Sequence, residues 1–166
     1  MKNCRGNQRS RLVSKFTEAD HEKVERVMEL HFKYLDKVHA SDEEHASRRR
    51  RGDPEEEDED EAYMRRIENG LFTLQLVDYI IVEACATGAA TVKEVRRGSS
   101  KVTSKVVRQM FRFQRVTHLL GQRSASITTI RNVVRVYAGN LGETANDDEA
   151  TKNSERQYLL HLVDKF

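Results

Sequence analysis

The sequence of 166 residues predicts an all-α fold, and three observations support this class. Proline occurs once, at Pro54, and no stretch shows the apolar–polar alternation of strands. Ala, Leu, Glu, Arg and Lys, which favour helices, are frequent. Apolar residues also recur every three or four positions through most of the chain. Although no clean internal repeat is visible, we expect helices joined by short turns and stacked as an α-solenoid.

Residues 1–40 are expected to form the helices of a truncated repeat. Residues 2–15 contain five basic and no acidic residues, and a short apolar edge follows at Leu12, Val13 and Phe16. A second helix is expected from Thr17, which together with Asp20 resembles a capping box. Its apolar face contains Val24, Val27, Met28, His31, Leu35 and Val38. A truncated array would lack its N-terminal neighbour and leave this apolar edge exposed, so we expect marginal solubility or self-association of the chain alone.

Residues 41–60 lack an apolar period and are expected to form a charged, flexible loop. The four consecutive arginines Arg48, Arg49, Arg50 and Arg51 are a candidate nuclear-localisation patch. Eight acidic residues follow within 53–61. These acids can screen the arginines, so a solvated loop is the alternative interpretation. The last of them are expected to stabilise the start of the next helix through its dipole.

The most apolar stretch, residues 61–87, is expected to be the central helix around which the others pack. Its second half is apolar around most of its circumference, which indicates burial between other helices. Asp78 and Glu83 interrupt the run, so it is too short to span a membrane. Asn69 and Gly70 predict a bend, and Gly88 is expected to end the helix. The expected structural anchors are Tyr63, Leu71, Leu74, Ile81, Tyr137 and Phe166.

Residues 61–166 are expected to hold the C-terminal helical repeats. Within them, residues 91–135 are strongly basic, with Glu94 as the single acid. We expect a helix over 102–120 that ends before Gly121, and another that begins after Ser126. A polar loop over 142–153 should precede a closing helix, whose apolar face runs to the last residue and predicts a docked C-terminus.

The basic region offers a candidate contact surface for RNA or for an acidic protein partner. Its most prominent candidates are Arg108, Arg112, Arg115 and Arg123. The aromatic residues nearby fall at positions typical of a helical core, so no exposed stacking platform is evident. The pattern therefore favours protein partners or solvent over direct RNA recognition.

Catalytic and metal-binding motifs are weak in this sequence. It has no glycine-rich phosphate loop, and Glu25 stands where a zincin motif beginning at His21 needs its second histidine. His31 and Cys85 lack neighbours at ligand or catalytic spacing, so His31 is expected to be a partly buried core histidine and Cys85 a small buried hydrophobe. The two cysteines suit a reducing compartment, and no apolar segment of signal-peptide length opens the chain. We expect no enzymatic activity, cofactor or metal.

Several stretches carry a resemblance to a known family. They are KNCRGNQRSRLVSKFTEADHEKVERVMELHFKYL, MELHFKYLDKV, EAYMRRIENGLFTLQLVDYIIVEAC, SITTIRNVVRVYAGNLG and ERQYLLHLVDKF. In this order they resemble the C-terminal part of the proteins of the beta-catenin-like family. The members of this family are armadillo-type nuclear proteins associated with pre-mRNA splicing. Family members are several times longer, so the chain is expected to be a fragment, an incomplete gene model or a shortened paralogue. Residues 91–113 have no counterpart and are a candidate insertion or translated non-coding sequence.

The resemblance implies a non-catalytic α-solenoid scaffold of the splicing machinery, located in the nucleus. Its implied partners are proteins of the nineteen complex of the spliceosome, including the cell-division-cycle-5-like protein. The helical surface would offer grooves for partner peptides. An RNA-binding accessory role through residues 91–135 is the alternative.

Overall fold

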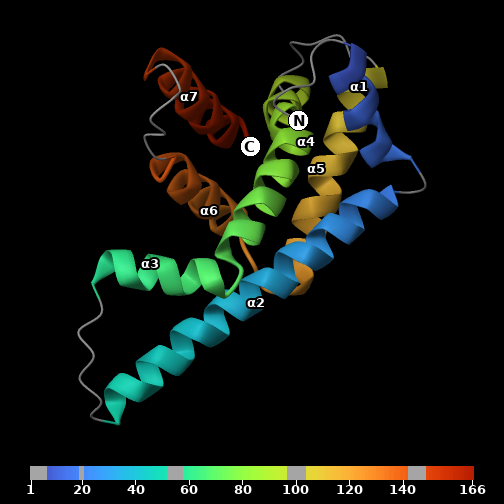
Figure 1. Cartoon of the computed structure of the whole chain (residues 1–166). Helices are drawn as coiled ribbons and strands as arrows, with labels where there is room; N and C mark the ends of the chain where they lie inside the picture. Colours follow the sequence, from blue (N-terminus) through green and yellow to red (C-terminus); the bar gives the residue numbers. More distant parts are fainter. Residues whose placement is uncertain (1–6, 19–20, 52–57, 97–103, 142–148) are drawn as a thin grey trace.

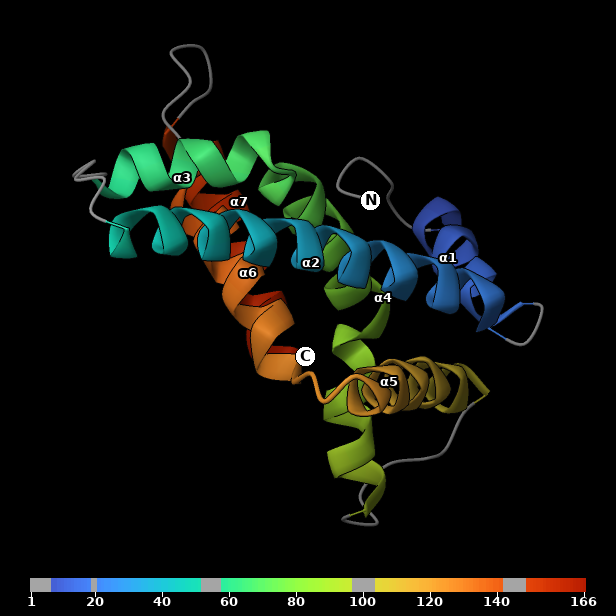
Figure 2. The ribbon, with the colours of Figure 1, turned by 90° about the horizontal axis from the view of Figure 1, so that it is seen from below.

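The computed structural model describes residues 7–18, 21–51, 58–96, 104–141 and 149–166. In chain order the elements are α1 (Asn7–Ser14), the 3-10 helix η1 (Lys15–Thr17), α2 (Glu22–Arg50), α3 (Glu59–Glu68), α4 (Leu71–Arg96), α5 (Ser104–Gln122), α6 (Ile127–Gly139) and α7 (Glu149–Lys165). These described segments contain no strand, which confirms the all-α prediction. Helix α4 lies in the middle, with α2 and α5 on one side and α6 and α7 on the other (Figures 1 and 2).

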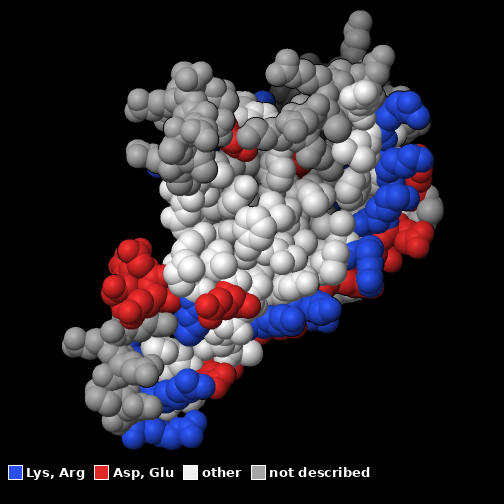
Figure 3. All heavy atoms as spheres, in the orientation of Figure 1, with Lys and Arg blue, Asp and Glu red and all other residues white. Residues whose placement is uncertain are grey.

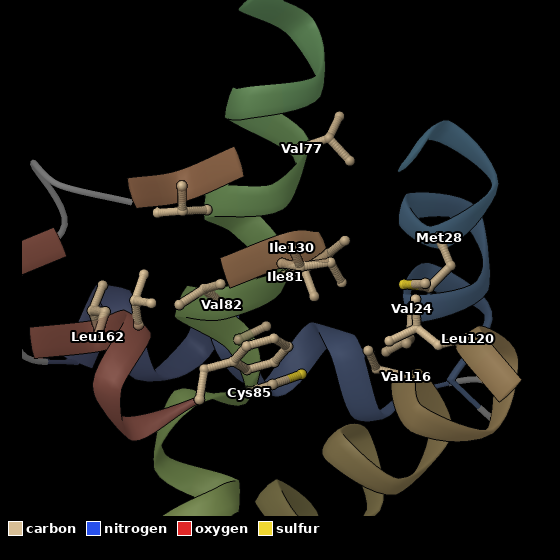
Figure 4. Packing of buried hydrophobic residues seen from close by; sticks show 14 of the residues in the cluster. Val24, Met28, Val77, Ile81, Val82, Cys85, Val116, Leu120, Ile130 and Leu162 are labelled. Atoms are coloured by element: carbon tan, nitrogen blue, oxygen red, sulfur yellow. The ribbon is translucent and has the colours of Figure 1, made fainter. Parts of the chain in front are cut away.

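The main hydrophobic core surrounds α4, as predicted for the central helix. Figure 4 shows its side chains between those of α2, α5, α6 and α7. The contacts join Val77, Ile81, Val82 and Cys85 of α4 to Val24, Met28, Val116, Leu120, Ile130 and Leu162. Burying such side chains stabilises a fold by roughly 1.5–3 kcal/mol each. Four helices from distant parts of the sequence therefore depend on α4 for their packing.

The predicted helix over 61–87 is in fact two helices, α3 and α4. Gly70 separates them with φ +98°, a left-handed conformation that glycine adopts without a steric penalty. A Cβ atom at this position would lie only 2.8 Å from Cδ1 of Tyr34. The bend expected at Asn69 and Gly70 is therefore confirmed, and it is sharp enough to end one helix and begin another.

A smaller apolar cluster holds α3 against α2 and α4. Its buried members are Val38, Leu71 and Leu74, and Tyr63 and Ile67 of α3 pack against them. Of the six expected anchors, four are buried, namely Leu71, Leu74, Ile81 and Phe166. Tyr63 and Tyr137 are only partly buried.

Two helices are longer than predicted. Helix α2 continues to Arg50 through the first half of the predicted loop, because Ala, Glu and Arg sustain a helix without core contacts. The Glu44–Arg48 pair at spacing i,i+4 and the arginines near the helix C-terminus favour this extension. Helix α4 runs past Gly88 to Arg96, since alanines on both sides offset the cost of one interior glycine, about 1 kcal/mol.

The helix starts were predicted with mixed success. Thr17 does not cap α2, because it lies in η1 and His21 occupies the N-cap position with φ 70°. Ser126 caps α6 as expected, accepting a hydrogen bond from the backbone N–H of Thr128 at 3.2 Å. Asp58 and Glu61 form a capping box at the start of α3. The acids before the predicted central helix thus stabilise its start by specific hydrogen bonds.

The C-terminal residue Phe166 packs in the hydrophobic core, as the apolar face of the last helix predicts. Helix α7 begins at Glu149, so the last part of the expected 142–153 loop is helical; residues 142–148 lie outside the description. Phe166 is 1% exposed, and its ring meets Phe113 of α5 edge-on at 5.8 Å between centroids. Helix α5 includes Gly121, which had been expected to follow it. Residues 2–6 of the expected first helix also lie outside the description.

Candidate interaction surface

The four arginines of the candidate localisation patch lie at the far end of α2. Arg48, Arg49 and Arg50 form its last turn and Arg51 is its C-cap. All four are exposed, although Arg48 pairs with Glu44 at 2.5 Å. Consecutive helical residues point in directions about 100° apart, so these side chains surround the helix end. The patch therefore presents positive charge on several sides; its role in localisation stays a prediction.

The arginines predicted to contact RNA or an acidic partner are tied into the fold where the structure describes them. Arg112 is 3% exposed and donates a hydrogen bond from Nη1 to the carbonyl of Val13 at 2.9 Å. Arg115 pairs with Glu25 of α2. The side chain of Arg108 lies outside the described part of the chain.

Of the three arginines whose side chains the structure describes, Arg123 is the most exposed, at 58% of its side chain. It pairs with Asp36 of α2 at 3.4 Å, and its guanidinium lies over the ring of Phe32 at 4.7 Å. These contacts join the turn after α5 to α2 and take up part of the positive charge of Arg123. A role for Arg108, Arg112, Arg115 and Arg123 in binding a partner stays a prediction, but Arg112 is too buried to supply an exposed guanidinium.

Several large apolar side chains are exposed around the junction of α3 and α4. Met64 is 57%, Phe72 50% and Leu76 37% exposed. The interpretation of the central helix as buried on nearly all sides is therefore wrong for the beginning of α4. Figure 3 shows an extensive face without charged side chains in the middle of the molecule. Such surface is typical of protein contacts when it is contiguous.

The polar residues that interrupt the apolar runs form a buried pair between α2 and α4. His31 and Asp78 are both 0% exposed, and Nδ1 of His31 is hydrogen-bonded to Oδ1 of Asp78 at 2.5 Å. Burial raises the pKa of Asp78, and the hydrogen bond and charge of His31 offset this only in part. The prediction that His31 is a core histidine is confirmed. Asp78 as its partner was missed, although both residues stand in apolar stripes.

A second polar contact joins α4 to α7. The hydroxyl of Tyr158 donates to the carboxylate of Glu83, with distances of 2.8 Å to Oε2 and 3.1 Å to Oε1. Glu83 is 5% exposed, so a hydrogen bond is needed to offset its burial. The two acids that interrupt the apolar run of α4 therefore each bind a neighbouring helix, Asp78 through His31 of α2 and Glu83 through Tyr158 of α7.

An ion-pair network connects α2 to α3. Asp42 accepts hydrogen bonds from Arg65 at 3.1 Å and from Arg66 at 2.9 Å. Burial raises the pKa of Asp42, but the hydrogen bonds and charges of Arg66 and Arg65 outweigh it and leave the pKa below its usual value. This network holds the extended half of α2 beside α3.

Cys85 is fully enclosed in the core, as expected of a small buried hydrophobe. Burial raises the pKa of its thiol to about 12, while the charge of Arg112 lowers it slightly. The thiol is therefore protonated at neutral pH, which makes it a poor nucleophile and metal ligand. Among the described residues, no three His, Cys, Asp or Glu side chains gather as a metal site. None of the described helices has the length and apolar character needed to cross a bilayer.

Comparison with known proteins agrees with this architecture. The family model described as "Catenin-beta-like, Arm-motif containing nuclear" matches residues 1–135. The whole chain aligns over 171 positions with beta-catenin-like protein 1, with 39% identity to the Bos taurus, 37% to the Mus musculus and 36% to the Homo sapiens protein. It covers 26% of each of them, so it spans about a quarter of the length of these curated relatives. The family resemblance of the sequence is thus confirmed, and the chain belongs to the catenin-beta-like family of Arm-motif-containing nuclear proteins.

Proposed function

We propose that this chain is a non-catalytic interaction scaffold of the pre-mRNA splicing machinery. The observation that carries the proposal is its membership in an Arm-motif family described as nuclear, together with a body of helices packed around α4. Stacked helical repeats expose long ridges and grooves, and proteins of this architecture use them to bind other proteins. The nucleus is accordingly the proposed location.

The proposed partners follow from the sequence resemblance. They are proteins of the nineteen complex of the spliceosome, among them the cell-division-cycle-5-like protein. Two kinds of surface on this chain suit protein partners: the uncharged face in the middle of Figure 3 and the charged sides of α2. Met64 of α3 and Phe72 at the start of α4 are further large apolar side chains that are exposed and available for contacts with a partner.

The contacts of the basic region favour a protein scaffold over the alternative of an RNA-binding accessory protein. Arg112, Arg115 and Arg123 each bind a group of this same chain. An arginine that must first leave an internal partner contributes less to electrostatic binding of phosphates. RNA binding through residues 91–135 remains the second proposal, tested by the salt dependence of affinity for a single-stranded RNA.

Affinity capture from nuclear extract tests the proposed function. The immobilised chain should enrich splicing proteins relative to a Leu74→Asp variant, whose buried charge should disrupt the fold. Enrichment that depends on the folded state would support a scaffold. A folded chain that recovers no splicing protein would contradict it.

The location is tested separately with a fluorescent fusion. Replacing Arg48, Arg49, Arg50 and Arg51 together by Gln removes the charge of the patch and keeps good helix formers. If the patch directs localisation, the variant should lose nuclear enrichment, while a fusion with the exposed Arg156 and Lys165 of α7 replaced by Gln should keep it. Equal nuclear enrichment of all three proteins would remove the patch from the proposal.

A further inference from the structure

The outer face of α2 is divided along its length into two edges of opposite charge. Successive residues of a helix are turned by about 100°, so positions three and four apart share an edge. One edge is acidic and contains Glu22, Glu25, Glu29, Asp36 and Glu43. The other edge, here called the basic row, contains Lys23, Arg26, Leu30, Lys33 and Lys37. Figure 3 shows Lys and Arg side chains following α2, with acidic side chains on their outer side.

The acidic edge is paired with basic side chains from outside α2, whereas the ion pair that Arg26 of the basic row forms lies within α2 itself. Arg115 of α5 and Arg123, in the turn that follows α5, pair with Glu25 and Asp36. Among the described carboxylates, the basic row has one ion-pair partner, Glu29, which lies 2.7 Å from Arg26; both side chains are more than 60% exposed (73% and 63%). An ion pair this exposed contributes little to stability, so Arg26 can exchange Glu29 for a carboxylate of a partner.

The three lysines of the basic row make no ion pair with any described residue, and all are exposed. The ammonium groups of Lys33 and Lys37 lie 5.8 and 5.4 Å from the centre of the Tyr34 ring. The ring holds them over the surface without neutralising them. The row therefore presents net positive charge to solvent.

The spacing of the basic row matches a helical partner. Its members follow one another at intervals of 3, 4, 3 and 4 residues along α2, and the row is about 21 Å long. Intervals of this kind form the stripe along which a second helix lies in helix–helix packing. Leu30, which is partly buried against the core, provides an apolar contact in the middle of the row.

A nucleic acid fits the row less well. The Tyr34 ring packs against Gly70 and beneath the two lysines, so it offers no free face for stacking a base. The acidic edge runs beside the row over its whole length and repels the phosphates of a neighbouring strand. A partner helix can place acidic residues on the side that faces the basic row and uncharged residues on the side that faces the acidic edge. It can therefore bind the row without repulsion from the acidic edge.

We propose that the basic row of α2 is a docking surface for an acidic amphipathic helix of a partner protein. The matching helix carries Asp or Glu at intervals of three and four residues and an apolar residue opposite Leu30. This inference rests on the proposed scaffold function, because it specifies the chemistry of one partner. It adds a contact site on the edge of the molecule, separate from the uncharged face.

The test uses a synthetic helical peptide of 21 residues with four glutamates and one leucine at these intervals. Fluorescence anisotropy measures its affinity for the full chain, with a scrambled peptide of the same composition as the control. Replacing Lys33 and Lys37 by Glu turns two attractions into repulsions and should weaken binding about ten-fold. The Arg156→Glu, Lys165→Glu variant changes the net charge equally on exposed positions of α7 and should bind like the original chain.

Three results would overturn the inference: equal binding of the scrambled peptide, an equal loss in the α7 variant, or unchanged affinity after the Lys33 and Lys37 substitutions. A single-stranded RNA that binds more tightly than the peptide, and loses affinity in the same α2 variant, would show a nucleic-acid surface instead. Thermal melts establish that the variants are folded. The double variant Lys33→Gln, Lys37→Gln removes the two positive charges without introducing negative ones and serves as a less disruptive substitution.

If the peptide does not bind while the folded chain still captures splicing proteins, the docking surface is refuted and the scaffold function stands.

Discussion

Replacing Leu74 by Ala tests whether the start of α4 is packed as tightly as the structure shows. Leu74 is 1% exposed and belongs to the cluster that α2, α3 and α4 share. The change removes three carbon atoms, which at about 0.8 kcal/mol each gives about 2.4 kcal/mol of lost burial. The cavity left between three helices adds to this, for a total of about 3–4 kcal/mol.

The matched control is Leu76→Ala, two positions further along the same helix. Leu76 is 37% exposed, so the same chemical change should cost only about 1–1.5 kcal/mol and leave no closed cavity. Urea unfolding followed by circular dichroism at 222 nm measures both free energies of unfolding. Equal costs for the two variants, or a smaller cost for Leu74→Ala, would refute the packing of α3 and α4 described above.

Three further predictions concern particular residues. Gly70→Ala should destabilise the chain by about 1–2 kcal/mol, because alanine is strained at φ +98° and its Cβ would clash with Tyr34; an unchanged urea midpoint would contradict this. Because the pKa of Asp78 is raised in the folded state, the stability of the chain relative to Asp78→Asn should decrease as pH rises above about 4, the pKa of an unfolded Asp; parallel stability–pH curves for the two proteins would count against it. In a Cys4→Ser background, Cys85 should react with a thiol reagent at pH 8 only after denaturant is added, since its pKa is about 12; rapid labelling of the native chain would disprove its burial.

The sequence allowed the helical class, the central position of α4 and the docked C-terminus to be predicted, because all three follow from apolar spacing. Phe166, for example, ends an apolar face and is buried as expected. The length of α2 could not be predicted in this way, since residues 40–50 form a helix through intrinsic propensity and charge pairs rather than through a core. Periodicity carries no signal for such a segment.

The contacts of the charged residues were the least predictable part of the candidate surface. Arg112 and Arg123 occupy similar basic surroundings in the sequence, yet one is 3% exposed and the other has a side chain 58% exposed. Which of them faces water depends on how α5 packs against α1 and α2, and this is a tertiary property. The two edges of α2 were likewise present in the sequence, but the pairing of Glu25 with Arg115 and of Asp36 with Arg123 is a tertiary contact that shows which edge is partly neutralised.

The proposed scaffold function is tested most directly by capture of splicing proteins from nuclear extract before and after ribonuclease treatment. A protein scaffold predicts that splicing proteins, including the cell-division-cycle-5-like protein, stay bound to the folded chain when RNA is digested. Their loss after digestion, or no enrichment over the Leu74→Asp variant, would contradict the account.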